Sequence, residues 1–186
     1  MKFKYIDKEI KYIGSQLAPH WIYKNFNILS DAVVSFCGGA DVKITEMVDL
    51  EDVIQNDSIY SPNMLHFIVE KFNTPLIEGV YLQRLLVIIA KEIIEKFTGM
   101  TLVRNGDDLF FNEKKLSVSI ATCSFNSILI HFAMNITTEG TPIETSGLKS
   151  DLHIENMKEL AEMILVKYTE EIEDIKNASC KVRGVL

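Results

Sequence analysis

The chain has 186 residues, of which 47% are hydrophobic, and carries a formal net charge of −7. This length fits one domain with a substantial core, and the acidic balance argues against a nucleic-acid duplex as partner, because phosphate binding normally needs a basic surface. Three scattered cysteines make a poor disulfide framework and indicate a reducing compartment. The longest apolar run, Leu85 to Ala90, is six residues and no signal-peptide pattern is present, so we expect a cytoplasmic protein with no membrane partner.

The first half of the chain alternates short strand and helix patterns. We expect a hairpin over residues 2–13, a helix over 16–25, a strand over 31–37, an acidic loop over 46–57 with a helix near 50–54, and a strand over 64–72. The Gly38-Gly39 pair is expected to end the strand before it as a turn. The carboxylates of the acidic loop make it poorly suited to holding a triphosphate without a metal ion.

The second half opens with the clearest helix, where apolar residues recur at spacings of three and four over residues 80–97. We then expect strands over 101–104, 108–111, 115–122 and 128–136, a loop over 139–149, a last helix over about 151–175 capped by Asp151, and a partly mobile tail to residue 186. The loop over 139–149 either closes over a ligand or only connects the sheet to the last helix. Hairpins dominate, so residues 1–186 are predicted to form one α+β domain with a mostly antiparallel, mixed sheet packed with helices.

Small and polar residues gather on two neighbouring strands of this pattern. Lys115, Ser117 and Ser119 share one face of the first strand, and His131 and Asn135 share one face of the next. A register that matches these faces would set Lys115 opposite Asn135 and Ser119 opposite His131. The resulting polar stripe, with a cation at its end, would suit the floor of a ligand pocket. The alternative is a solvated sheet face on which Lys115 is a surface lysine.

The run R-N-G-D-D-L-F-F-N-E-K-K-L-S-V-S-I, residues 104–120, resembles the biotin protein ligase pattern. In that pattern a basic residue leads into Pro-Asn-Asp-Leu, a short hairpin follows, and Arg/Lys-Lys-Leu-x-Gly comes next. The later A-M-N-I resembles the family's Gly-x-Asn strand, and lipoate ligases share an Asn-Asp and a Lys in similar context. The resemblance covers roughly residues 60–136 and implies a biotin/lipoate protein ligase-like, class II synthetase-related fold. In those ligases the carboxylate of biotin or lipoate attacks the α-phosphate of ATP, and the acyl-adenylate is passed to a lysine of an acceptor protein.

The resemblance also implies roles for individual residues. Lys115 matches the family's lysine, which offsets charge as carboxylate and phosphate oxygens converge, so it is the candidate catalytic residue. Asp108 matches an Asp at the nucleotide or Mg²⁺ end of the site, and Asp107 stands where the family has Asn. The candidate ligand-binding residues are Arg104, Asp107, Asp108, Ser117, Ser119, His131 and Asn135. The family's Gly-Arg-Gly-rich phosphate loop has no counterpart, and Val118 replaces a Gly that lies close to the ligand.

The whole chain is similar to an archaeal family of uncharacterised proteins described only as a domain of unknown function. The shared segments are Y-I-G-S-Q-L, M-L-H-F-I-V-E, K-L-S-V-S-I-A-T and T-P-I-x-T-x-G-L. Three hypotheses follow. The chain is a ligase-like or acyl-transferring enzyme that binds a small carboxylate or nucleotide near Lys115, with ATP and Mg²⁺ as cofactors and an acceptor protein as partner. Alternatively, it is a non-catalytic descendant that binds a metabolite or a protein, or a homodimeric scaffold that pairs exposed strands. No resident metal site is expected, because no Cys-x-x-Cys spacing occurs.

Overall fold

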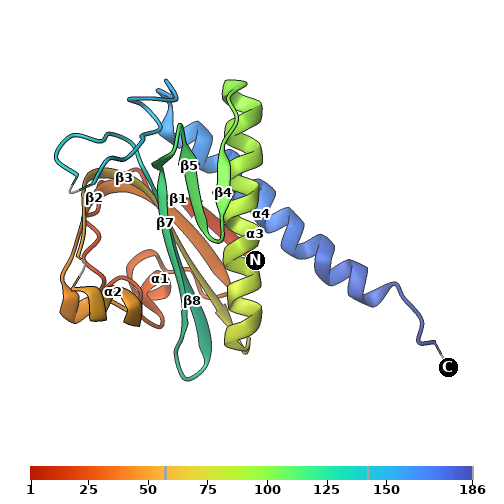
Figure 1. The fold of residues 1–186 in the computed structure, drawn as a ribbon. Coiled ribbons are helices and arrows are strands. Elements are labelled where there is room, and N and C mark those ends of the chain that lie inside the picture. Colours follow the sequence, from red (N-terminus) through yellow and green to blue (C-terminus); the bar gives the residue numbers. More distant parts are fainter. Residues whose placement is uncertain (57, 142, 186) are drawn as a thin grey trace.

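The structure is a computed structural model and describes residues 1–56, 58–141 and 143–185. A five-stranded sheet forms its centre, with a three-stranded sheet beside it (Figure 1). The larger sheet has the order β1-β2-β3-β8-β7, made of Lys2–Tyr5, Ala32–Val42, Ile59–Phe72, Ser127–Asn135 and Ser117–Cys123. The smaller sheet has the order β4-β5-β6, made of Val103–Asn105, Asp108–Phe111 and Lys114–Lys115. β1 is parallel to β2 and the other strand pairs are antiparallel, which confirms the mostly antiparallel, mixed α+β sheet.

Helices cover both faces of the larger sheet (Figure 1). They are α1 (Trp21–Phe26), a 3₁₀ turn η1 (Ile44–Glu46), α2 (Leu50–Gln55), α3 (Leu76–Thr98) and α4 (Met157–Cys180). The long helices α3 and α4 bury one face around Phe67, Phe132 and Tyr168. The opposite face packs against α1 and the N-terminal segment. Helix α3 follows the apolar spacing seen in the sequence and ends where Gly99, at φ 73°, adopts the left-handed conformation that glycine favours.

The N-terminal segment is not a hairpin, contrary to the prediction. It runs alongside β2 as an added edge, and beyond β1 three of its backbone N–H groups bond to that strand. These bonds run from Ile6 to the Ser35 oxygen at 2.8 Å, from Ile10 to Cys37 at 3.0 Å and from Tyr12 to Gly39 at 2.8 Å. The unpaired carbonyls of a long edge strand attract such pairing, whereas a hairpin would leave them exposed.

Other predicted boundaries also change. β2 continues through Gly38-Gly39 to Val42, with an irregular register at the glycines, so this pair does not form a turn. The helix expected over residues 16–25 covers only Trp21–Phe26. The last helix begins at Met157 because the Asn156 side chain accepts a hydrogen bond from the Glu159 N–H, and it extends to Cys180. Asp151 caps no helix, and its carboxylate instead accepts from the Gly147 N–H at 2.8 Å.

The register between β7 and β8 differs by one residue from the predicted one. Ser119 lies opposite Phe132, and Ile120 lies opposite His131. A one-residue shift exchanges the faces, so Ser117 and Ser119 share the α3 face and do not share a face with His131 and Asn135. The predicted register assumed that the polar residues of both strands share one face. That assumption was wrong because both faces of this sheet are covered, and β8 is buried along its whole length.

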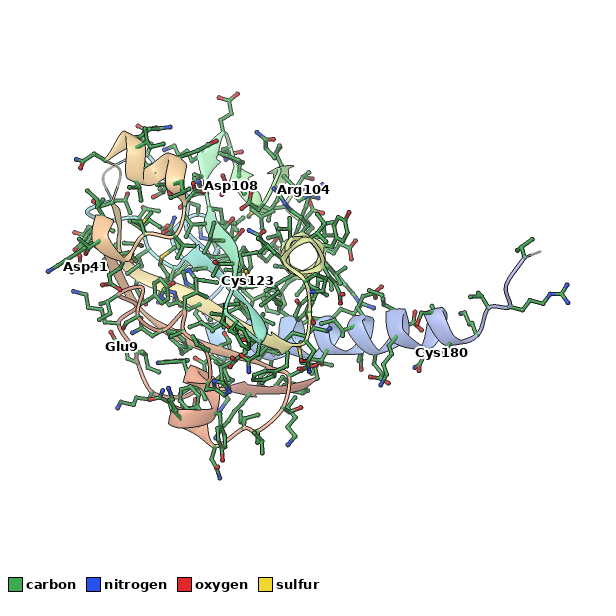
Figure 2. All side chains as sticks on the ribbon, turned by 90° about the horizontal axis from the view of Figure 1, so that it is seen from below. Glu9, Asp41, Arg104, Asp108, Cys123 and Cys180 are labelled. Carbon is green, nitrogen blue, oxygen red and sulfur yellow. The ribbon has the colours of Figure 1, made fainter. Side chains whose placement is uncertain are left out.

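All three cysteines are free thiols, in agreement with the prediction that they form no disulfide framework. Cys180 lies on the part of α4 that projects from the body of the molecule (Figure 2). Within the described ranges, no helix is both long enough and apolar enough to cross a bilayer.

Candidate functional site

A cavity of about 520 Å³ lies on the side of the larger sheet that faces the N-terminal segment. Its wall is made by the N-terminal segment, the η1–α2 region, the start of β3, the β5–β6–β7 region, β8 and the loop that follows it. Its chemically distinctive lining residues are Tyr12, Glu46, Asp49, Asp52, Ser61, Asp107, Asp108, Lys115, His131, Asn135, Thr141 and Thr145. The volume is in the range of small-molecule sites. Among the predicted site residues only Arg104 lies outside the lining of this cavity.

Lys115 and Asp108 form an ion pair at the cavity, with 2.9 Å between Nζ and Oδ2. Strand pairing within the small sheet sets Lys115 opposite Phe110, and the Ser146 N–H bonds to the Lys115 carbonyl at 3.0 Å. Burial raises the pKa of Asp108, and the Lys115 ammonium opposes that rise. The side chains of Lys115 and Asp108 are 32% and 27% exposed, so the pair is within reach of a ligand. The loop over 139–149, apart from residue 142, which lies outside the described residues, supplies Thr141, Ile143 and Thr145 to the cavity.

Asp107 has a structural role. Its carboxylate pairs with Arg84 Nη1 at 3.1 Å and accepts hydrogen bonds from Gln83 Nε2 and Ser119 Oγ, each at 2.9 Å. It therefore fastens α3 to the end of β5 and to β7. These bonds hold Asp107 and Ser119 in place at the cavity wall, so both residues help to position the site.

Replacing Asp107 with Ala is expected to lower the free energy of unfolding by about 1–2 kcal/mol, since partly buried hydrogen-bonding groups lose their partner. Urea titration followed by circular dichroism measures the change. Glu92→Ala is the matched control: it removes a carboxylate from an exposed position of α3, and the expected change is within about 0.5 kcal/mol. Equal stabilities of Asp107→Ala and Glu92→Ala would contradict the structural role.

Two other predicted residues have local partners: Ser117 is buried, and Arg104 lies outside the lining of the cavity. The Ser117 hydroxyl accepts the Leu109 N–H at 2.9 Å in a buried bond. Arg104 is exposed on β4, where its guanidinium donates to the Gly106 carbonyl of its own turn. In the view of Figure 2, Arg104 lies farther from α2 than Asp108 does. A sequence match could not reveal this, because the direction of the Arg104 side chain is set by the local turn.

His131 lines the floor of the cavity, and a second buried histidine, His66, lies directly behind it. His66 Nε2 lies 3.0 Å from the Gly38 carbonyl oxygen, and His66 Nδ1 lies 3.1 Å from His131 Nε2. Burial lowers the pKa of His66 to about 4. Burial, and next the charge on His66, hold the pKa of His131 well below its usual range. Both imidazoles are therefore neutral near pH 7.

Three further side chains complete the floor. The ring of Tyr12 stacks on His131, with 3.7 Å between ring centroids and an interplanar angle of 13°. Asn135 is buried, and its Oδ1 accepts the Ser61 hydroxyl at 2.9 Å, so its amide N–H₂ points elsewhere. Tyr12 and Ser61 were not predicted as site residues, because nothing local in the sequence shows that they meet β8.

The acidic segment before β3 lies at the cavity, where Glu46, Asp49 and Asp52 contribute to the lining. Asp49 also accepts the Glu51 N–H at 2.8 Å and so caps α2, which confirms the short helix expected here. Asp57, part of the predicted acidic loop, lies outside the described residues. In total, five carboxylates and one ammonium belong to the described lining residues, so the field in the cavity is negative.

Comparison with known proteins gives relatives along the whole chain. A family model described as "Domain of unknown function (DUF366)" matches residues 1–183. The uncharacterized protein MJ0805 of Methanocaldococcus jannaschii is 36% identical over 182 residues, which is 95% of this chain and 81% of that protein. A solved protein of unknown function from Pyrococcus horikoshi has 37% identity and a TM-score of 0.92, and the match covers 99% of this chain and 100% of the other.

More distant solved structures are ligases. A biotin protein ligase from Aquifex aeolicus, in complex with biotin and ATP, has a TM-score of 0.61 at 16% identity over 95% of this chain and 72% of the other. Ta0514, a putative lipoate protein ligase from T. acidophilum, has a TM-score of 0.62 at 13% identity over 93% of this chain and 86% of the other. At such identities the likeness shows the fold alone, and it confirms the ligase-like fold that the sequence motif predicts.

Proposed function

The chain belongs to the DUF366 family, and we propose that it binds a small organic carboxylate in the cavity beside Lys115. The observation that carries the proposal is the Lys115 ammonium on the cavity wall. Asp108 is its ion-pair partner among the described residues. A lysine ammonium has three N–H donors, so Lys115 has donors left for a second carboxylate. Charge-assisted bonds of this kind are stronger than neutral ones.

The lining does not fit the triphosphate of ATP. The segment between β2 and β3 carries the acidic residues Glu46, Asp49 and Asp52, and Lys115 is the one lysine or arginine among the described lining residues. A negative field repels a polyphosphate, whereas a single carboxylate needs one cation only. The proposed ligand is therefore held as the free carboxylate, without acyl-adenylate formation or transfer to an acceptor protein.

Calorimetric titration tests this proposal. The ligands are biotin, lipoate and a series of small monocarboxylic acids, each with and without Mg²⁺·ATP. We expect at least one acid to bind in the absence of ATP, and Lys115→Met to weaken that binding at least about tenfold, as loss of a charge-assisted bond predicts.

Lys114→Met is the matched control, because it removes the same charge from the adjacent residue. Lys114 is exposed, lies 3.8 Å from Glu144 and is not a lining residue of the cavity, so we expect its affinity to stay within about twofold of the original protein. Equal weakening by both substitutions would mean that Lys115 acts only through net charge. Tight Mg²⁺·ATP binding that Lys115→Met abolishes, or failure of every acid to bind, would overturn the proposal.

A further inference from the structure

The two buried histidines fix each other's protonation. The Gly38 carbonyl can only accept a hydrogen bond, so His66 Nε2, 3.0 Å away, carries the proton. In a neutral imidazole the other nitrogen is then an acceptor, so His66 Nδ1 accepts from His131 Nε2 across 3.1 Å. By the same rule His131 Nδ1 has no proton and presents a lone pair.

Packing prevents these rings from turning to another arrangement. His66 has no exposed surface and stacks on Phe36 with 5.0 Å between centroids, while Tyr12 covers His131 at 3.7 Å. His131 is 3% exposed, and what remains exposed borders the cavity. The acceptor is therefore a fixed feature of the floor.

This acceptor has no protein partner within the described residues, since His66 is the one group to which His131 is hydrogen-bonded there. In the same residues, Ser35 Oγ is the single fully covered side-chain polar atom that lacks a partner. Since His131 Nδ1 also lacks a partner, it is not fully covered by protein atoms. Because His131 lines the cavity, this nitrogen is accessible from the cavity. In the free protein water satisfies a lone pair in such a place, and a ligand that displaces this water must supply a donor in its stead.

We propose that His131 Nδ1 determines specificity at the inner end of the cavity, and that the ligand presents an N–H or O–H donor there, as a cyclic urea, a lactam or an amide does. The proposal rests on the proposed function for the other end of the ligand. His131 and Asn135 are four residues apart on β8, which is roughly 13 Å along a strand. Asn135 is bonded through its N–H to the carbonyl of Leu116, the neighbour of Lys115. The ligand is thus an elongated acid with its carboxylate at Lys115 and its donor at His131.

This chemistry separates two acids of similar length. The cyclic urea of biotin carries N–H donors, whereas the dithiolane of lipoate has none. A dithiolane at His131 would leave the Nδ1 lone pair desolvated without a partner, which disfavours binding. The geometry thus favours acids that end in a cyclic urea over acids that end in a dithiolane.

The test uses uncharged probes, so that it does not depend on Lys115. Nitrogen NMR of the full chain, ¹⁵N-labelled at histidine, is expected to show Nε2–H and a bare Nδ1 for both His66 and His131. Titration with 2-imidazolidinone, a cyclic urea with two N–H groups, should shift the His131 Nδ1 resonance. The probe 1,3-dimethyl-2-imidazolidinone has no donor and should bind at least tenfold more weakly. A proton on His131 Nδ1, an equal response to both probes, or no response to either would overturn the proposal.

His131→Phe supplies a second measurement, because Phe keeps a ring against Tyr12 and removes the acceptor. In this variant the preference between the two probes is expected to disappear. Should the variant fail to fold, the two probes on the original protein still decide. If 2-imidazolidinone binds at His131 but no carboxylate binds through Lys115, the proposed function fails and this inference stands. If a carboxylate binds through Lys115 but the protein does not distinguish the two probes, this inference fails and the proposed function stands.

Discussion

Lowering the pH from 6.5 to about 4 is expected to decrease the free energy of unfolding by about 3 kcal/mol through His66 alone. Burial depresses the pKa of His66 from 6.5 to about 4, so the folded protein keeps this imidazole neutral. The unfolded chain takes up a proton once the pH falls below 6.5, and the folded chain does not. The stability is thus complete above pH 6.5, falls through this window, and is independent of His66 below about pH 4.

His131 acts in the same direction, because its pKa is also depressed by burial and by His66. Each neutral buried histidine contributes a slope of about 1.4 kcal/mol per pH unit where only the unfolded chain is protonated. Asp108 acts in the opposite direction at lower pH, since burial raises its pKa in the folded state. The slope should therefore be read between pH 6.5 and 5. Urea unfolding at half-unit pH steps measures it.

His66→Gln removes the contribution of His66 to the slope of unfolding free energy against pH. Comparing slopes instead of absolute stabilities separates this effect from any loss of packing. His153→Asn is the matched control: His153 is exposed, and at φ 57° Asn is well tolerated. It should leave the slope unchanged. A slope in His66→Gln equal to that of the original protein would show that His66 is protonated in the folded state.

The sequence predicts local features of this protein well. Helix α3 follows from the spacing of its apolar residues, and β5 covers the residues expected for it, Asp108–Phe111. The motif match also singles out Asp108 and Lys115, and the structure brings them together at 2.9 Å because they belong to neighbouring strands of one small sheet. Such features depend on a few consecutive residues, and the sequence pattern contains them.

The floor of the site depends on long-range packing and could not be predicted in the same way. His66 and His131 meet only because β3 and β8 are adjacent, and Tyr12 reaches His131 only because the N-terminal segment follows β2. The alternation of polar and apolar residues along β7 and β8 predicted the wrong register. A sheet covered on both faces has no solvent-exposed face that polar residues could identify. The role of Asp107 was missed for a related reason: its partners Gln83 and Arg84 lie on α3.

Gly38→Ala is expected to lower the free energy of unfolding by at least about 3 kcal/mol, through backbone overlap and lost hydrogen bonds. A Cβ at this position would lie against the carbonyl oxygen of Ile10 and 2.7 Å from its carbonyl carbon. Backbone atoms cannot turn aside as a long side chain does, so the N-terminal segment would have to move away from β2. That movement would break the bonds from Ile10 to Cys37 and from Tyr12 to Gly39.

The displaced Tyr12 would also uncover His131, so Gly38→Ala should weaken ligand binding as well as folding. Urea unfolding measures the first effect and calorimetric titration the second. Gly184→Ala is the matched control, because a Cβ there meets no atom within 4 Å and both properties should stay unchanged. A Gly38→Ala protein as stable as the Gly184→Ala protein would mean that the N-terminal segment does not lie against β2. In that case Tyr12 would not cover His131 either.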